Sequence, residues 1–124
     1  MSMIYGVGID IIEVKRIKEA VSCFGERFLS RVFTEGEVAY CQVKANKYQS
    51  LAARFCAKEA VIKALRMSGL SLNEIEVVSS KDRVPEIRLK GKSKEKFEKL
   101  FLGPIHLSLS HTKDHALAQV VIET

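Results

Sequence analysis

Residues 4–12 alternate between two sets of positions, the period-two pattern of a β-strand. One set is apolar throughout, and the other contains Gly6, Gly8 and Asp10. Glycine within a strand often marks the close approach of a ligand or of another backbone. We therefore expect the glycine face to be open and to carry one carboxylate. The alternative is that Asp10 only ends the strand and caps the following helix.

Three segments with the spacing of amphipathic helices follow this strand. The first covers residues 13–23 and is expected to stop at Gly25. The second opens at a Thr34-x-x-Glu37 capping box and runs to about residue 43. The third is a long helix over residues 49–67, which Gly69 is expected to end. The basic segment around residues 27–31 is either a partner-docking surface or a solvated face.

The second half of the chain alternates again. Strands are predicted at residues 75–78 and 84–89, around a turn at Lys81-Asp82-Arg83, and a basic amphipathic helix at residues 92–101. A final hairpin is predicted from residues 106–111 and 115–122, with its turn at 112–114. The order strand, three helices, two strands, helix, two strands predicts a single α+β domain over residues 1–124, with a mostly antiparallel sheet and one long central helix.

The central helix carries charge among alanines and leucines. Helical periodicity places four apolar residues in one stripe: Leu51, Phe55, Ile62 and Leu65. Glu59 and Lys63 run along the flank of that stripe, at the edge of the buried face. A buried carboxylate requires a compensating cation or metal ion, which favours a functional site. The alternative is a helix-stabilising i, i+4 ion pair worth about 0.2–0.5 kcal/mol.

Composition and charge restrict the partners. The chain is 47% hydrophobic and 28% charged, as in soluble globular proteins, and no apolar run approaches the roughly 20 residues of a membrane span. No signal peptide is recognised in residues 1–12, and three widely spaced cysteines indicate reduced thiols in a cytoplasm. The net charge of +5 favours a polyanionic partner, whether a nucleotide, a nucleic acid, an anionic lipid surface or an acidic protein.

Asp10 on a strand and Glu59 on a helix suit a magnesium ion, which prefers oxygen ligands and is commonly held by one or two carboxylates with waters and substrate phosphates. Such a site expects a phosphorylated substrate, and four basic side chains are available to neutralise it: Arg54, Lys58, Lys63 and His111. Motifs for an activated nucleophile or a phosphate loop are absent from the sequence. The attacking group is therefore expected to come from a substrate.

Four motifs occur in order along the chain. They are Gly8-Ile9-Asp10, Thr34-x-x-Glu37, Arg54-Phe55-x-Ala57-Lys58-Glu59-Ala60-x-x-Lys63-Ala64 and Ser108-Leu109-Ser110-His111-Thr112. Together they resemble the holo-acyl-carrier-protein synthases, the short bacterial type of 4′-phosphopantetheinyl transferase. The resemblance covers nearly the whole chain. It implies transfer of the 4′-phosphopantetheine arm of coenzyme A to a serine of apo acyl carrier protein, with release of adenosine 3′,5′-bisphosphate, in fatty acid biosynthesis.

The resemblance also implies roles for individual residues. Asp10 and Glu59 would bind magnesium, and a metal-bound water or Glu59 itself would take the serine proton. Lys63 would stabilise the departing phosphate. The coenzyme A contacts would be Arg54, Lys58, Lys63, Ser110, His111 and Thr112, and the docking surface for the acidic carrier protein would include Arg16, Arg27 and Phe28. Short members of the family are typically cytoplasmic homotrimers whose cleft lies between subunits.

Two departures from the family pattern concern the central helix. Arg66-Met67-Ser68 follows Leu65 where the family usually has glycine at once, and Cys56 stands where alanine is common. A small nucleic-acid-binding domain is the main competing hypothesis, but it explains the charge and not the carboxylates, and the final strands lack an aromatic platform. A catalytically silent trimeric scaffold is a third. We expect neither a nucleic acid nor a membrane as partner.

Overall fold

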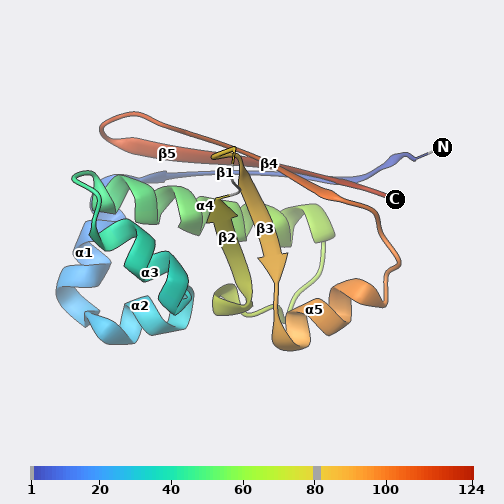
Figure 1. Cartoon of the computed structure of the whole chain (residues 1–124), viewed down its shortest axis with the longest axis horizontal. Helices are drawn as coiled ribbons and strands as arrows, with labels where there is room; N and C mark the ends of the chain where they lie inside the picture. Colours follow the sequence, from blue (N-terminus) through green and yellow to red (C-terminus); the bar gives the residue numbers. More distant parts are fainter. Residues whose placement is uncertain (1, 80–81) are drawn as a thin grey trace.

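We describe a computed structural model of the chain over residues 2–79 and 82–124. A three-stranded antiparallel sheet has the strand order β1 (Ile4–Glu13), β5 (His115–Glu123), β4 (Ile105–His111). The long helix α4 (Lys47–Leu65) lies along one face of this sheet (Figure 1). The predicted α+β class, the C-terminal hairpin and the long central helix are confirmed.

The other elements surround α4. Helices α1 (Val14–Phe24), α2 (Glu26–Val32) and α3 (Glu35–Gln42) gather at one end of the molecule (Figure 1). A short 3-10 helix, η1 (Leu72–Glu74), leads into a separate antiparallel pair, β2 (Ile75–Ser79) and β3 (Pro85–Leu89), and α5 (Gly91–Glu98) follows. The predicted turn between β2 and β3 includes Lys81, which lies outside the described residues. In the described part of the chain, no helix is long and apolar enough to cross a membrane.

Four α-helices, not the predicted three, lie between the first two strands, and the 3-10 helix η1 follows them. The additional one is α2, within the segment that the sequence marked only as basic. Gly25 separates it from α1 with a positive φ of 54°, and donates its N–H to Val21 O at 2.8 Å. The Gly25 carbonyl accepts from the N–H of Leu29 at 3.1 Å. A helix of seven residues is too short to show a clear period of its own, so its packing decides its formation.

Two glycines bring β1 into backbone contact with α4. A Cβ atom on Gly6 would lie 1.9 Å from the carbonyl oxygen of Ala64, and one on Gly8 would lie 1.9 Å from that of Ala60. The glycine face is therefore packed against a helix, and the prediction that it is open is wrong. Asp10 does not cap α1 either, since Glu13 holds the N-cap position.

The opposite face of β1 is apolar and exposed. Val7, Ile9 and Ile11 are 53%, 55% and 63% exposed, and the strand pairing places them beside Val121, Gln119 and Leu117 of β5. Large aliphatic side chains in a contiguous exposed patch usually mark an interaction surface.

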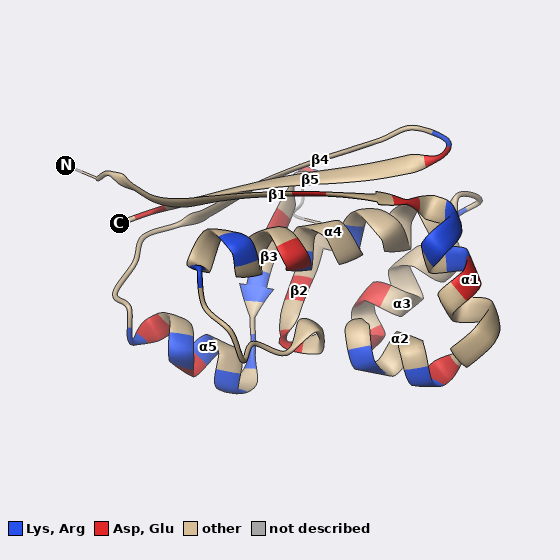
Figure 2. Ribbon diagram, turned by 180° about the vertical axis from the view of Figure 1, so that it is seen from behind, with Lys and Arg blue, Asp and Glu red and all other residues tan. Residues whose placement is uncertain are grey.

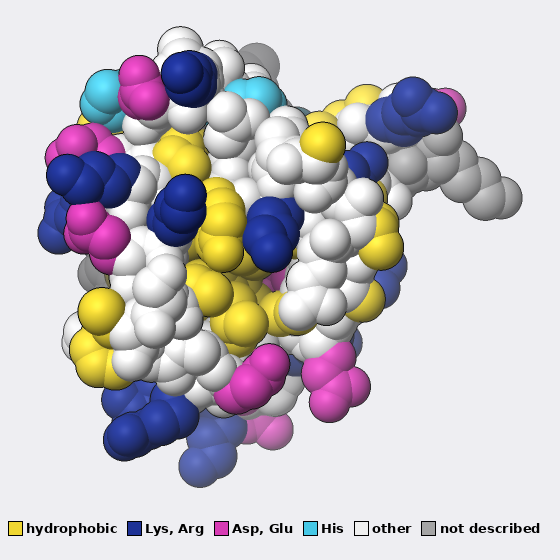
Figure 3. All heavy atoms as spheres, turned by 90° about the vertical axis from the view of Figure 1, so that its left-hand side faces the viewer, with side chains coloured by type: hydrophobic (Ala, Val, Ile, Leu, Met, Phe, Trp, Pro, Cys, Tyr) yellow, Lys and Arg dark blue, Asp and Glu magenta, His cyan; other side chains and the backbone are white. Residues whose placement is uncertain are grey.

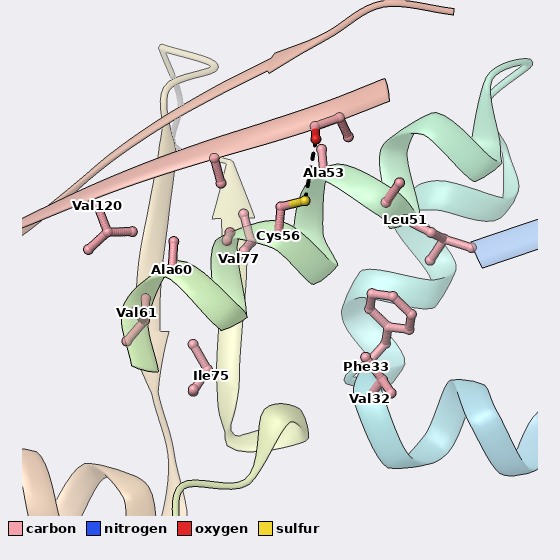
Figure 4. Packing of buried hydrophobic residues seen from close by; sticks show 14 of the residues in the cluster. Val32, Phe33, Leu51, Ala53, Cys56, Ala60, Val61, Ile75, Val77 and Val120 are labelled. Carbon is pink, nitrogen blue, oxygen red and sulfur yellow. Dashed lines mark hydrogen bonds between the residues drawn. The ribbon is translucent and has the colours of Figure 1, made fainter. Parts of the chain in front are cut away.

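Helix α4 is buried on most of its circumference, among side chains from β5, β2 and the N-terminal helices (Figure 4). The Cys56 thiol lies 3.5 Å from the Ala116 carbonyl oxygen of β5, the contact dashed in Figure 4. The small residues Ala60 and Ala64 face β1, whereas Phe55 and Ile62, which were predicted to lie on the inner stripe, are only half-buried. The helix is thus a central rod and not a surface helix with one buried face.

The helix ends earlier than predicted, at Leu65. Arg66 takes the left-handed conformation with φ 54°, and its N–H bonds Ile62 O at 3.0 Å. Its guanidinium donates to Tyr5 O at 3.1 Å and lies 4.7 Å from the centre of the Tyr5 ring. Glycine would adopt this conformation without strain, and the Tyr5 contacts offset the strain for arginine.

Candidate active site

Asp10 and Glu59 lie in the same region because the rise of β1 over two residues nearly equals the rise of α4 over four. Two residues of a strand cover about 6.6 Å and four residues of a helix about 6.0 Å. Gly6 faces Ala64 and Gly8 faces Ala60, so the next inward residue, Asp10, falls one turn further toward the helix N-terminus. Both carboxylates line one cavity of about 300 Å³. The structure therefore brings the two predicted metal ligands together.

The two carboxylates share one nearby ammonium group. Lys63 Nζ lies 3.1 Å from Asp10 Oδ1 and donates to Ile9 O at 2.9 Å. Burial and the charge of Asp10 raise the pKa of Glu59, and Lys63 lowers it to a smaller extent. Beneath them, burial and the same two negative charges raise the pKa of Cys56 to about 12, so Cys56 stays a neutral thiol. Across the residues that the structure describes, the carboxylate of Glu59 has no ion-pair partner closer than the Lys63 that is bonded to Asp10, so the pair of carboxylates is suited to a further cation.

The donor set restricts which cation fits. No group of three or more His, Cys, Asp or Glu side chains among residues 2–79 and 82–124 is placed to hold a metal ion. Two hard carboxylates in an open cavity leave most of a coordination shell to water and substrate. This is the arrangement that magnesium prefers in phosphate-handling sites.

The same cavity reaches the N-terminal helices. Arg16 of α1 and Phe28 of α2 line it together with Asp10 and Glu59. Phe28 also lines an adjoining apolar groove of about 270 Å³ between α1 and α2, where Arg27 contributes a wall. The three predicted docking residues are thus continuous with the carboxylates. Lys and Arg are frequent along α1 and α2 (Figure 2), and this end of the molecule shows an apolar band flanked by basic side chains (Figure 3).

Arg54 lines a different cavity, of about 450 Å³, on the β4 side of α4. Its guanidinium lies 4.3 Å from the centre of the Tyr40 ring, and the side chain is almost fully buried. Among the described residues, Arg54 Nε is a buried nitrogen without a hydrogen-bond partner. A hydrogen bond with Ser79 and the nearby charges of Lys44 and Arg54 lower the pKa of Tyr40. These features suit an anionic ligand group.

Ser110, His111 and Thr112 lie at the exposed end of β4. The strand pairing places Ser110 on the outer face of the sheet, opposite Leu117, and His111 at the next position, opposite Ala116. Thr112 shapes the hairpin turn: its N–H donates to His115 O at 2.8 Å, and its hydroxyl accepts from His115 N at 3.1 Å. The structure does not bring these three residues into the cavity of Asp10 and Glu59.

Lys58 is a predicted coenzyme A contact that the structure places inside the core. Its side chain is completely buried, and its ammonium donates to Glu37 Oε1 at 2.7 Å, to Leu72 O at 2.9 Å and to Ile75 O. All three donors of the ammonium are therefore used inside the core. Glu37 in turn closes the predicted capping box with Thr34 and accepts from the N–H of Val77. Lys58 ties α4 to α3 and β2 and is not exposed to a ligand.

The sequence did not point to Tyr40 or Ser79 as site residues. Both line the Arg54 cavity, together with Arg83 and residues 107–109 of β4. They come from separate parts of the chain and share no spacing. The sequence offered only Lys44, four residues after Tyr40, whose ammonium lies 4.7 Å from the centre of the Tyr40 ring.

Comparison with known proteins identifies the family of the chain. The 4′-phosphopantetheinyl transferase superfamily model matches residues 6–120. The holo-[acyl-carrier-protein] synthase of Thermodesulfovibrio yellowstonii is 48% identical over 97% of this chain and 99% of that protein. The crystal structure of the Neisseria meningitidis holo-[acyl-carrier-protein] synthase superposes with a TM-score of 0.91, at 32% identity over 98% of this chain and all of that one.

A third relative carries a ligand. The Helicobacter pylori holo-[acyl-carrier-protein] synthase, solved in complex with coenzyme A, matches with a TM-score of 0.82 and 35% identity over 94% of this chain and 98% of that one. Family model, sequence and fold agree over nearly the full length. The chain therefore belongs to the 4′-phosphopantetheinyl transferase superfamily and is an enzyme of its holo-[acyl-carrier-protein] synthase group.

Proposed function

We propose that the protein transfers the 4′-phosphopantetheine group of coenzyme A to a serine of an acidic apo acyl carrier protein, with magnesium as cofactor. The observation that carries the proposal is the cavity in which Asp10 and Glu59 lie together, beside the basic surface of α1 and α2. Relatives bind coenzyme A, as the Helicobacter pylori complex demonstrates for that protein.

In the proposed reaction, the serine oxygen attacks the phosphorus that carries the pantetheine arm. A new P–O bond forms, the bond from that phosphorus to the bridging oxygen breaks, and adenosine 3′,5′-bisphosphate leaves. Glu59 is suited to take the serine proton, since its raised pKa makes it a better base than an ordinary carboxylate. A water molecule is the alternative base. Lys63 lies beside Asp10, one of the proposed metal ligands. A phosphate held at the metal would therefore be near the Lys63 ammonium, which would stabilise the charge that develops as the phosphate leaves.

Magnesium fits the residues that are present, because two carboxylates face one cavity and Lys63 is bonded to only one of them, Asp10. When bound, the ion would neutralise pyrophosphate charge and make the phosphorus more electrophilic. Asp10 and Glu59 would hold it, because burial and the charge of Asp10 disfavour the ionised form of Glu59 unless a cation compensates it.

The transfer itself is tested by mass spectrometry. Purified protein, magnesium, coenzyme A and an apo carrier protein are expected to give a carrier heavier by one phosphopantetheine group. The same mixture without magnesium or with a chelator serves as the control. Absence of any mass gain with several apo carriers would reject the proposed function.

The basic surface of α1 and α2 is proposed to dock the carrier protein. Arg27 lines the apolar groove that adjoins the reaction cavity, and Phe28 lines both. A carrier protein bound to this surface could place its serine in the cavity of Asp10 and Glu59 while it stays bound to α1 and α2. Electrostatic attraction of this kind mainly accelerates encounter and weakens as salt increases.

Reversing one charge tests the docking surface. Arg27→Glu is expected to raise KM for the carrier protein about tenfold and to leave KM for coenzyme A unchanged, with the effect shrinking at high salt. The matched control is Arg88→Glu, which makes the same change on β3. Equal effects of the two substitutions would mean that only net charge matters and that the surface is not specific.

We also propose that the active unit is a homotrimer in which each site is shared between two subunits. The carboxylate cavity and the Arg54 cavity lie on opposite flanks of α4, because β1 and β4 are the two edge strands of the sheet. The exposed apolar face of Val7, Ile9 and Ile11 provides a surface through which copies could associate. Association would bring one copy's Arg54 cavity to another copy's carboxylates.

Mixing inactive variants tests the shared site. Glu59→Gln and Arg54→Met are each expected to be inactive, but subunits refolded together should regain about one quarter of the sites if each site takes Glu59 and Arg54 from different copies. Each variant refolded alone is the control, and sedimentation gives the number of subunits. A mixture that stays inactive while forming mixed oligomers would place both residues within one copy's site.

The product of this transfer is a carrier that bears a pantetheine thiol, the form that acyl-chain synthesis requires, so fatty acid biosynthesis is the pathway that we propose. A cytoplasmic location fits the cysteines, since Cys23, Cys41 and Cys56 are all unpaired thiols in the described residues.

A further inference from the structure

Lys63 is bonded to one of the two proposed metal ligands. Its ammonium lies 3.1 Å from Asp10 Oδ1, and its second acceptor is the Ile9 carbonyl of the same strand. The Asp10 side chain is 19% exposed, whereas the Lys63 side chain is 54% exposed. The carboxylate is therefore fixed in the wall of the cavity, and the lysine reaches it from the solvent side.

We propose that Lys63 acts as an internal counter-ion that competes with the divalent cation for Asp10 and is released toward the substrate phosphates when the cation binds. The inference deepens the proposed function and rests on it. It assigns Lys63 a second role, in the metal-free protein, beside its proposed contact with the leaving phosphate.

Distance and charge prevent Lys63 and a magnesium ion from occupying the Asp10 carboxylate together. A magnesium ion needs a carboxylate oxygen at about 2.0–2.1 Å. An ammonium already hydrogen-bonded to that carboxylate lies within a few ångströms of where the ion must sit, and two cations at this separation repel strongly. Asp10 Oδ1 can serve one of them well, but not both.

Lys63 is also able to move. It is the last basic residue of α4 and sits one turn after Glu59, on the solvent side of the helix. Neither of its two bonds is buried as those of Lys58 are, and a lysine stem has several rotatable bonds. Substrate phosphates offer a stronger negative charge than a single carboxylate. Their arrival would draw Lys63 from Asp10 and free the carboxylate, so phosphate binding and metal binding would support each other.

A magnesium titration without coenzyme A measures the competition directly. By calorimetry, Lys63→Met is expected to bind magnesium about tenfold more tightly than the wild type, since one competing charge is gone. Lys63→Arg keeps the counter-ion and should resemble the wild type. Lys113→Met, which removes the same charge at the β4–β5 turn, is the matched control and should bind within about twofold of the wild type.

Thermal unfolding provides a second measurement. The metal-free Lys63→Met variant should have a lower Tm than the wild type, because Asp10 loses its partner, and magnesium should raise its Tm by more. If Lys63→Met does not fold, Lys63→Gln replaces it, since glutamine keeps a hydrogen bond to the Ile9 carbonyl without the charge.

Magnesium binding by Lys63→Met that is equal to or weaker than that of the wild type would overturn the proposal. Failure of every variant and of the wild type to bind magnesium would overturn it as well. The transfer assay distinguishes failure of the counter-ion role from failure of the proposed function. If the wild type transfers phosphopantetheine but Lys63→Met does not bind magnesium more tightly, the proposed function stands and only the counter-ion role is rejected.

Discussion

Replacing Glu59 with glutamine is expected to lower the rate of phosphopantetheine transfer by about a thousand-fold or more, and to stabilise the metal-free protein at neutral pH. The rate falls because the substitution removes both a proposed metal ligand and a candidate base, each of which contributes factors of about 10² to 10⁴ in comparable sites. The stability rises because a half-buried carboxylate beside Asp10 is lost.

The gain in stability has a defined pH dependence. Burial and Asp10 raise the pKa of Glu59 in the folded protein, so the folded state binds protons more tightly than the unfolded state. Ionised Glu59 therefore destabilises the fold at pH values above its raised pKa. As the pH falls through that value the penalty decreases, and it disappears below the ordinary pKa of glutamate, where both states are protonated. The difference in Tm between Glu59→Gln and wild type should follow this course.

Transfer rates measured by mass spectrometry check the expected loss of activity in Glu59→Gln, and Tm values measured across the pH range check the expected gain in stability. Glu19→Gln is the matched control, because Glu19 is exposed on α1 with only a long contact to Lys15. A Glu59→Gln enzyme with the wild-type rate would remove Glu59 from the reaction. A lower Tm at neutral pH in the absence of metal would show that Glu59 stabilises the fold.

Replacing Lys58 with methionine is expected to reduce the free energy of unfolding by about 3–5 kcal/mol, the usual effect of removing one partner of a buried ion pair. Methionine fills most of the space but leaves the Glu37 carboxylate, itself completely enclosed, without its cation. The carbonyls of Leu72 and Ile75 lose their donor as well. Such a loss is a large part of the stability of an ordinary domain.

Urea denaturation measures this effect, and a double-mutant cycle identifies its origin. In Lys58→Met combined with Glu37→Gln, no uncompensated charge remains, so the double variant should lose clearly less than the sum of the two single variants. Lys15→Met, at an exposed position on α1, should leave the stability almost unchanged. A fully stable Lys58→Met variant with weakened coenzyme A binding would instead restore the ligand contact predicted from the motif.

The two carboxylates could be located from the sequence because two simple periods determine where they lie. Alternation along β1 puts Asp10 on the face of Gly6 and Gly8, and helical spacing puts Glu59 at the edge of α4. Lys58 could not be assigned in the same way. It is adjacent to Glu59 in a linear motif, yet about 100° around the helix from it, and only the position of α3 and β2 decides that this direction points into the core.

The Arg54 cavity shows a different limit. Its walls come from α3, β2, β3 and β4, and neither local propensity nor spacing says that Tyr40 and Ser79 will line one cavity with Arg54. The additional helix α2 was missed for a related reason: over seven residues, its basic and apolar positions fit a helix and a loop equally well. Packing against α1 and η1 selects the helix.

The contact between β1 and α4 has a consequence for how this site can be shifted or redesigned. Gly6 and Gly8 admit the carbonyl oxygens of Ala64 and Ala60, and the pairing of β1 with β5 from Gly6 to Glu13 holds the strand in that position. A shift of β1 along α4 would break this pairing and carry Asp10 away from Lys63. The site therefore depends on the register of a strand whose backbone is fixed on both sides, and a designer who changes that register should expect to separate Asp10 from Glu59.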